Sequence, residues 1–259
     1  MATIIFEHHS QETPARLGAI LRDYGHHLRV VELHAGDSVP VDLDDVDAVV
    51  SMGGPMNVAD RDEHPWLAKE MELIREAHER DLPVVGICLG AQIVAAALGG
   101  EVAPMDEPEL GWHTVKLAFP GTIDPMLAGI PWTTMQVHGH ARQITELPPG
   151  ATPLAASRAT RTQAFKAGLH TYAFQYHFEW TRADIETAAA SFGAWFGADN
   201  KPAEATRRGI EKHYELYRHL GDRLCHNIAN LLMPLDKRLG GRRGAVEPVP
   251  VKNWKPAKS

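Results

Sequence analysis

The sequence predicts an α/β fold, with a mostly parallel central sheet flanked by helices, a small antiparallel extension and C-terminal helices. Three observations lead to this prediction. Short apolar runs alternate with helical patterns over the first hundred residues, which is the order of right-handed βαβ units. Short β-like segments separated by Pro-Gly turns occupy the middle of the chain, and from residue 182 the pattern becomes helical.

The parallel part of the sheet is predicted from four apolar runs and three helical patterns. The segment 66–79 repeats apolar residues at 67, 71, 74 and 77, which places them on one face of a helix. The uncharged run 83–87 leads directly into a helix of small residues and is expected to be a buried strand. The expected strands are 3–6, 28–33, 46–51 and 83–87, and the expected helices are 14–24, 66–79 and 91–98. This order is flavodoxin-like.

The second half of the chain is expected to contain the extension and further helices. Short strands are predicted at 114–119, 133–137, 155–157, 163–166 and 171–176, and the last of them returns to the main sheet. We expect a main α/β domain at 1–200, a helical extension at 201–236 and a basic tail with Pro and Gly at 237–259. The tail contains seven Lys and Arg residues and one Glu, and it is either a docking element or disordered.

Composition excludes several classes of protein. The 259 residues include 26 Lys and Arg against 33 Asp and Glu, which gives a net charge of −7 and no electrostatic reason to bind nucleic acid or an anionic membrane. The longest uncharged stretch, 82–100, is interrupted by Gly86, Gly90 and Gln92 and is too short for a membrane span. Two cysteines are too few for a disulfide framework, and the first residues, which contain neither a basic segment nor a long apolar run, lead us to expect no secretory signal. We expect a soluble cytoplasmic protein.

The segment 86–92, Gly-Ile-Cys-Leu-Gly-Ala-Gln, predicts a nucleophile. A buried strand enters Gly-x-Cys-x-Gly and a helix follows at once, which is the arrangement of a nucleophile elbow with sulfur as the reactive atom. The free N–H groups and dipole at a helix start favour the thiolate of Cys88. Alternatively, Cys88 is an inert buried cysteine, but such a residue does not need a glycine on each side. The second cysteine, Cys225, lies on a predicted amphipathic helix and is expected to be a core residue.

A partner for the thiol is predicted at the end of the strand 171–176. His177 follows this strand, and Glu179 shares its face because alternate residues of an extended segment point the same way. The carboxylate could therefore orient the imidazole, as the acid of a catalytic triad does. The chain has 15 histidines, and most are expected at the surface, including the pairs at 8–9 and 26–27.

Together these motifs resemble those of a known family. Gly-Ile-Cys-Leu-Gly-Ala-Gln at 86–92, Gly-Gly-Pro at 53–55 and His-Phe-Glu at 177–179 are similar to the motifs of class I, triad-type glutamine amidotransferases. The likeness covers residues 2–182 and is greatest to the amidotransferase domain of GMP synthetases. It implies that the domain at 1–200 is such an amidotransferase domain.

The resemblance also implies a role for each matching residue. In the catalytic triad, Cys88 corresponds to the nucleophile, His177 to the general base and acid, and Glu179 to the residue that orients His177. The N–H groups of Gly54 and Leu89 correspond to the oxyanion hole, and the residues that hold the substrate correspond to Gln92, His138, Gly139 and His140. Three residues depart from the family: Phe178 replaces the usual Pro, His140 stands where Asp is common, and Ala91 replaces a frequent His.

The implied reaction is hydrolysis of the glutamine side-chain amide through a glutamyl thioester, with a small-molecule substrate and no cofactor or metal. No Gly-rich phosphate-binding motif of a synthetase is present in the sequence, so the released ammonia would pass to a separate acceptor protein. Two alternatives remain at this stage. The chain could be a stand-alone hydrolase or transferase for γ-glutamyl amides or peptides, or an inactive binding or regulatory module.

Overall fold

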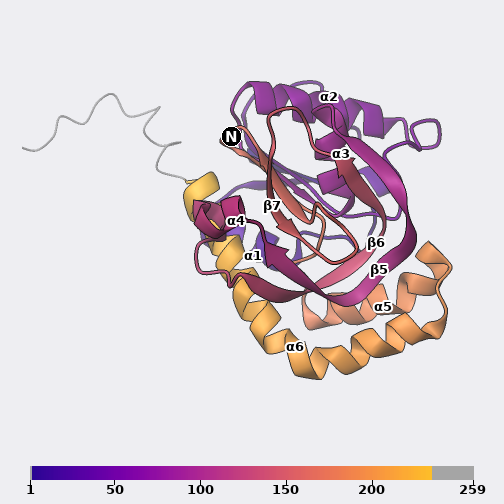
Figure 1. Ribbon diagram of the computed structural model, residues 1–259. Helices are drawn as coiled ribbons and strands as arrows, with labels where there is room; N and C mark the ends of the chain where they lie inside the picture. The colour runs from indigo at the N-terminus through magenta and orange to yellow at the C-terminus, as the bar shows by residue number, and fades with distance from the viewer. Residues whose placement is uncertain (1, 235–259) are drawn as a thin grey trace, which may run out of the picture.

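The computed structural model describes residues 2–234, and a nine-stranded sheet lies at its centre (Figure 1). The strand order is β2-β1-β3-β4-β9-β8-β7-β5-β6. The pairs from β2 to β9 are parallel, and the pairs from β9 to β6 are antiparallel. The predicted fold class is therefore confirmed. The tail predicted at 237–259 lies outside the described residues, as do the last two residues of the predicted extension.

The strands agree closely with the predictions in the parallel half and less well in the antiparallel half. They are β1 Ala2–Glu7, β2 Leu28–Glu32, β3 Val46–Ser51, β4 Val84–Ile87, β5 Glu101–Leu117, β6 Thr133–Glu146, β7 Thr152–Ala156, β8 Ala164–Ala167 and β9 Thr171–Phe174. The prediction of a strand only at 114–119 was wrong, because β5 begins thirteen residues earlier. The register of β5 shifts between Pro104 and Glu109, and this irregular stretch contains prolines and charges that conceal a strand pattern.

The helices cover both faces of the sheet. They are α1 Ala15–Asp23, α2 Trp66–Glu79, α3 Leu89–Ala97, α4 Phe119–Ile123, α5 Arg182–Phe196 and α6 Asn200–Asn227, which continues into the π-helical turn Ile228–Leu232. Side chains alternate along β1, so that Ile4 and Phe6 pack in one core with α2 and α3, whereas Ile5 packs with α1 and the end of α6 on the other face. A third apolar cluster joins α5 to α6.

The parallel half of the sheet determines where the predicted site residues meet. Strands β4 and β9 are parallel neighbours with Ile87 opposite Phe174, and both end at the same edge of the sheet. Cys88 follows β4 directly, and its backbone N–H donates a hydrogen bond to the Phe174 carbonyl at 2.8 Å. His177 follows β9 and pairs with Val137 of β6 through a backbone hydrogen bond of 3.0 Å. This edge therefore brings the ends of β4 and β9 next to the middle of β6.

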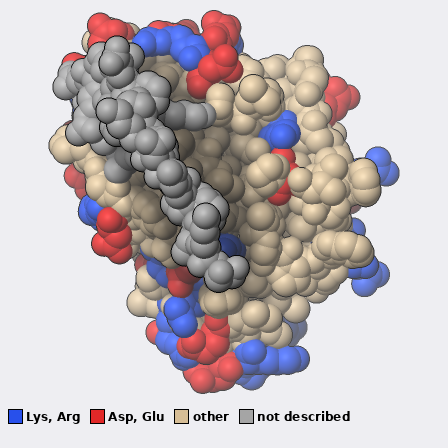
Figure 2. All heavy atoms as spheres, turned by 90° about the vertical axis from the view of Figure 1, so that its left-hand side faces the viewer, with Lys and Arg blue, Asp and Glu red and all other residues tan. Residues whose placement is uncertain are grey.

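The outer surface shows charges of both signs. On the face drawn in Figure 2, acidic and basic side chains lie side by side at the top and bottom of the view, and only scattered charges of both signs lie between them. Such mixing does not create the single-sign field that attracts nucleic acid or anionic lipid. Within residues 2–234, no helix is both long enough and apolar enough to cross a membrane, the 28-residue α6 included.

Candidate active site

Cys88 occupies a strained turn between β4 and α3. Its φ of 54° and ψ of −109° lie in a region that residues with a Cβ rarely adopt. The glycine on each side is needed because the turn is crowded. A Cβ on Gly86 would lie 2.5 Å from the Gly90 carbonyl oxygen, and a Cβ on Gly90 would lie 1.9 Å from the Ser51 carbonyl oxygen. The turn thus fixes the thiol at the start of α3.

Two contacts hold the ring of His177, and a third fixes the carboxylate of Glu179. The His177 Nδ1 and the Glu179 Oε1 are 2.6 Å apart, and both side chains are fully buried. The other carboxylate oxygen, Oε2, accepts a hydrogen bond from the Phe178 backbone N–H at 2.9 Å. The indole of Trp180 stacks on the imidazole with ring centroids 3.5 Å apart and planes 11° from parallel. Because Nδ1 is occupied by Glu179, Nε2 is the nitrogen left to exchange a proton.

The charges around His177 favour its protonated form. Burial alone would lower the pKa of the imidazole, but the negative charges of Glu179, Glu12 and Cys88 raise this pKa well above the usual value. An imidazolium beside a thiol stabilises the thiolate, which is the reactive form of cysteine. The charges around His177 therefore favour the protonated form of its imidazole.

The loop after β3 carries Gly54, and a buried histidine supports it. The Nδ1 of His8 donates to the carbonyl oxygens of Met52 and Gly53 at 3.0 and 3.1 Å, and its Nε2 lies 2.9 Å from Glu70 Oε2. Both ring nitrogens thus face acceptors. Burial would lower the pKa of His8, but Glu70 and these carbonyl groups raise it. The prediction of solvated histidines at 8–9 and 26–27 was wrong for His8 and His26, which are buried.

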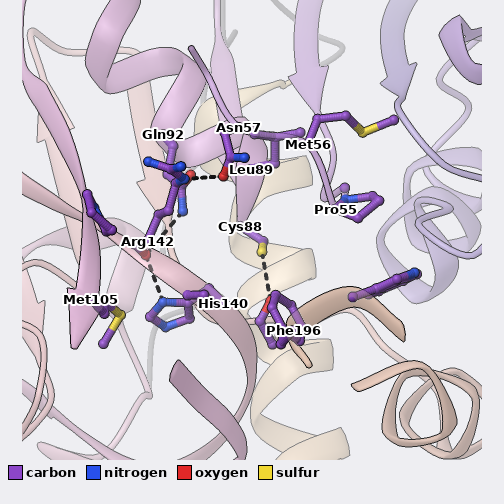
Figure 3. A pocket seen from close by; sticks show the side chains of 15 residues that line it. Pro55, Met56, Asn57, Cys88, Leu89, Gln92, Met105, His140, Arg142 and Phe196 are labelled. Atoms are coloured by element: carbon purple, nitrogen blue, oxygen red, sulfur yellow. Dashed lines mark hydrogen bonds between the residues drawn. The ribbon is translucent and has the colours of Figure 1, made fainter. Parts of the chain in front are cut away.

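A pocket of about 300 Å³ opens over Cys88. In Figure 3, Cys88 lies in the middle, with Gln92, Arg142 and His140 on one side and Pro55 and Met56 on the other. The thiol lies 3.7 Å from the Gly139 carbonyl oxygen. The lining includes six of the residues singled out in the sequence, namely Gly54, Cys88, Leu89, Gln92, Gly139 and His140. His177 and Glu179 are fully buried and, like His138, do not belong to its lining.

The segment 138–140 belongs to a buried polar network with Glu109. His140 Nδ1 donates to the Arg142 carbonyl at 2.9 Å, and His140 Nε2 lies 3.3 Å from both Glu109 Oε2 and His138 Nδ1. Donor atoms of the two histidines and Glu109 lie within 4.8 Å of one another, and two histidines with one carboxylate are a known zinc donor set. Since Ser157, Thr160 and Gln163 also donate to Glu109, protein groups already bind this carboxylate, and we assign the network a supporting role.

Several residues at the site have no recognisable motif in the sequence. Arg142 brings a positive charge to the pocket and donates through Nε to Asn57 Oδ1. Trp195 and Phe196, at the end of α5, provide apolar lining. Glu12 lies buried with its Oε2 3.9 Å from His177 Nε2. Of these residues, only Arg142 lies near a segment that the sequence assigned to the site, because it follows the segment 138–140 by two residues.

Comparison with known proteins identifies the family. The family described as "Glutamine amidotransferase class-I" matches residues 15–190. The glutamine amidotransferase-like protein YfeJ of Salmonella typhimurium is 33% identical over 177 residues, which are 65% of this chain and 73% of that protein. A glutamine-hydrolysing GMP synthase subunit of Natronomonas pharaonis is 30% identical over 177 residues, 68% of this chain and 86% of that relative.

A solved structure agrees in fold. The crystal structure of a glutamine amidotransferase from Thermotoga maritima covers 87% of this chain and 98% of its own, with a TM-score of 0.72 and 23% identity. At that identity the comparison concerns the fold alone. The resemblance predicted from the three sequence motifs is confirmed, and the chain belongs to the class I glutamine amidotransferase family.

Proposed function

We propose that this protein hydrolyses the side-chain amide of glutamine through a triad of Cys88, His177 and Glu179. One observation carries the proposal: the thiol at the strained turn opens into a pocket, while the His177–Glu179 pair lies buried at the neighbouring strand end. A nucleophile, a base and a residue that orients the base are the requirements for acyl transfer through a covalent intermediate.

In the first half of the reaction, the Cys88 thiolate attacks the amide carbonyl carbon. The carbonyl oxygen becomes negatively charged, and the N–H groups of Gly54 and Leu89 are the proposed donors to it. The Leu89 N–H is suited to this role because the first N–H groups of a helix have no partner within the helix. Each such donor contributes about 3 kcal/mol to the stability of the transition state. The His177 imidazolium then gives its Nε2 proton to the departing nitrogen, and ammonia leaves.

In the second half, water attacks the glutamyl thioester. His177, now neutral, accepts a proton from the water through Nε2, and the C–S bond breaks. The products are glutamate and the Cys88 thiolate, which re-forms its pair with the His177 imidazolium. This chemistry requires a reduced thiol, and both cysteines are free. A reducing compartment such as the cytoplasm suits it.

The pocket offers partners for the amino-acid end of the substrate. Among the described residues that line the pocket, Arg142 is the one with a guanidinium group. A guanidinium is well suited to bind an α-carboxylate. Gln92 is fixed by hydrogen bonds from its Nε2 to Gln175 Oε1 at 3.1 Å and to the Arg142 carbonyl at 3.3 Å. We assign Gln92 and Gly139, which line the pocket, to substrate binding. Both ring nitrogens of His140 already contact the Arg142 carbonyl and Glu109, so His140 and His138 support this wall of the pocket.

A separate protein is the proposed acceptor of the ammonia. The relative from Natronomonas pharaonis is itself named as one subunit of a GMP synthase, and the match to this chain extends over most of its length. We therefore assign the chain the role of the glutamine-hydrolysing partner.

A second candidate function is supported by the apolar side of the pocket. Met105, Trp195 and Phe196 line it together with Cys88, and such side chains suit an apolar group bonded to the amide nitrogen. The substrate would then be a γ-glutamyl amide or peptide, and the leaving group would be an amine. The chemistry at Cys88 would be unchanged.

The test is glutamate release from glutamine and from a panel of γ-glutamyl amides and peptides. Replacing Cys88 with Ala should abolish turnover, because no other group can form the thioester, and the melting temperature should stay close to that of the wild type. Cys225→Ser is the matched control. Cys225 is fully buried on α6, so this change should cost stability and leave the rate constant of the folded protein unchanged.

The panel also separates the two candidates. Hydrolysis of glutamine that increases when a co-purifying protein is added supports the role of a glutamine-hydrolysing partner. Faster hydrolysis of γ-glutamyl peptides than of glutamine supports the second function. Hydroxylamine added during turnover should divert the thioester to γ-glutamyl hydroxamate. Wild-type turnover in Cys88→Ala, or no turnover of any substrate with or without the partner, would contradict the proposal.

A further inference from the structure

Glu12 is a buried carboxylate for which the proposed mechanism has no use. It lies between β1 and α1, and only 3% of the residue is exposed. Its backbone N–H donates to the His9 carbonyl at 2.9 Å, which fixes this part of the chain. The side-chain Oε2 is buried and has no hydrogen-bond partner among residues 2–234. Because an unsatisfied buried carboxylate is costly, its position needs an explanation.

Glu12 points at the reactive nitrogen of His177. The Oε2 of Glu12 and the Nε2 of His177 are 3.9 Å apart, and Nε2 also lacks a hydrogen-bond partner among the described residues. Glu179 binds the opposite side of the ring at Nδ1. The imidazole thus lies between two carboxylates, one at each nitrogen.

The surrounding residues leave room for this contact and limit water. A Cβ on Gly53 would lie 2.3 Å from Glu12 Oε2 and 3.0 Å from His177 Cε1, so a glycine is required beside the pair. The indole of Trp180 covers a face of the imidazole. In such a buried site, charges interact more strongly than in water.

The charge on Glu12 changes near neutral pH. Burial is the main cause that raises its pKa to about 7; His177 and His8 lower the pKa, whereas Glu179 and Asp184 raise it. These four groups make the largest charge contributions to the pKa of Glu12. The carboxylate in turn contributes to the raised pKa of His177.

We propose that Glu12 is a positioning residue that stabilises the His177 imidazolium from its Nε2 side and thereby keeps Cys88 as a thiolate. The proton moves from Cys88 Sγ to His177 Nε2, and Glu12 interacts with the resulting positive charge without accepting the proton. When Glu12 is neutral, this attraction is absent and the proton returns to the sulfur. The inference rests on the proposed function only in taking Cys88 and His177 as the reacting pair.

The test is the pH dependence of alkylation of Cys88 by iodoacetamide, followed by mass spectrometry of the peptide that contains it. In the wild type, the rate should rise with an inflection near pH 7. In Glu12→Gln, which keeps the shape and removes the charge, this inflection should vanish and the rate at about pH 8 should fall about tenfold, the effect of one pKa unit. Glu12→Asp retains the charge and should recover part of the rate.

Glu7→Gln is the matched control. The pKa of Glu7 is also raised to about 7, by burial and by Glu32, but its carboxylate lies on β1 and makes no described contact with His177. The control should keep the wild-type profile. For glutamine hydrolysis, Glu12→Gln should lower kcat about tenfold and change KM less than twofold.

The outcomes separate this inference from the proposed function. An unchanged alkylation profile in Glu12→Gln, an equal change in Glu7→Gln, or a wild-type profile without the inflection would each overturn the inference. The last result needs no variant and applies even if Glu12→Gln fails to fold. An alkylation rate that depends on Glu12 in a protein that hydrolyses no amide would retain the inference and contradict the proposed function.

Discussion

Two buried pairs of histidine and glutamate surround the Cys88 turn. His177 and Glu179 form one pair behind the thiol. His8 and Glu70 form the other pair beneath the loop that carries Gly54, and Glu70 also accepts a hydrogen bond from the Ser51 hydroxyl at 2.7 Å. The first pair supplies the proposed base, and the second holds the backbone of the proposed oxyanion hole. Removing the charge of Glu179 or of Glu70 should therefore disturb the position of the base or of the loop that carries Gly54.

The His8–Glu70 pair should make the stability of the protein depend on pH. The pKa of His8 is raised above its ordinary value of 6.5, so the charged pair contributes stability that is fully present below that pH and is lost as the pH rises through the raised pKa. Glu70→Gln should cost about 3 kcal/mol at low pH, because one partner of a buried pair is removed. The difference from the wild type should therefore be larger at about pH 6, below the ordinary pKa of a histidine, than at a second, alkaline pH above the raised pKa.

Urea denaturation at both pH values measures this difference. Glu76→Gln is the control, because Glu76 forms an exposed pair with Arg80 on α2, and such pairs contribute less than about 1 kcal/mol. Its effect should be small at both pH values. A difference between Glu70→Gln and the wild type that stays constant or grows with pH would contradict the assignment of a charged His8.

At the scale of elements, the strand–turn–helix unit β4–α3 depends on close backbone contacts. Gly90 lies in the first turn of α3 against Ser51 of β3, and its N–H donates to the Met52 carbonyl at 2.9 Å. The helix start therefore packs directly on the backbone of the neighbouring strand. No side chain fits between them, which explains why the sequence has a glycine within a helix.

Replacing Gly90 with Ala should destabilise the protein by about 3 kcal/mol or more, because the new Cβ would overlap the Ser51 carbonyl oxygen and force the backbone to move. Turnover should fall as well, since Cys88 and Leu89 would move with the helix. Gly193→Ala on α5 is the matched control. Its Cβ would lie 3.4 Å from the Ala198 carbonyl oxygen, an ordinary contact, and alanine should stabilise the helix by up to about 1 kcal/mol. Similar melting temperatures for both variants would show that the contact at Gly90 is unimportant.

The elements differ in how well the sequence reveals them. Helix α2 and strand β3 have the predicted bounds. The apolar residues of α2 repeat with the helical period, and β3 is a short, almost continuously buried run that two glycines follow. Strand β5 was mostly missed. Its first half has few buried positions, so the pattern of alternate burial is absent there. The prolines and acidic residues at 104–108 resemble a loop, although the chain continues in the sheet on both sides of them.

At the scale of the whole molecule, contacts between distant segments limit what a sequence can reveal about a site. Cys88, His177 and Glu179 are each part of a short motif and could be identified one by one. Glu12 and Trp180 act through contacts with His177, and neither belongs to a motif that predicts the contact. His8 was misassigned for the same reason, because its burial depends on Glu70 and Trp66 from α2.

Arg16 is another long-range contact, and it joins the first helix, the last long helix and the segment after His177. Its guanidinium donates to the carbonyl oxygens of Phe178 and Trp180 and to the carboxylate of Asp222. The side chain is 11% exposed and also lies over the ring of Tyr217. Helix α6 thereby supports the backbone on which Glu179 is placed.

Arg16→Met should therefore reduce both stability and turnover. The substitution keeps the apolar stem but removes the donor to the carbonyl groups of Phe178, Trp180 and Arg218, and it leaves Asp222 paired with Arg218 alone. This loss should cost about 2–3 kcal/mol. Because Glu179 lies between Phe178 and Trp180, looser packing there should lower kcat more than it raises KM. Arg80→Met is the control, since Arg80 forms only an exposed pair with Glu76 and should change stability by less than about 1 kcal/mol. If denaturant unfolding and kinetics show equal effects for the two variants, α6 does not support the site through Arg16.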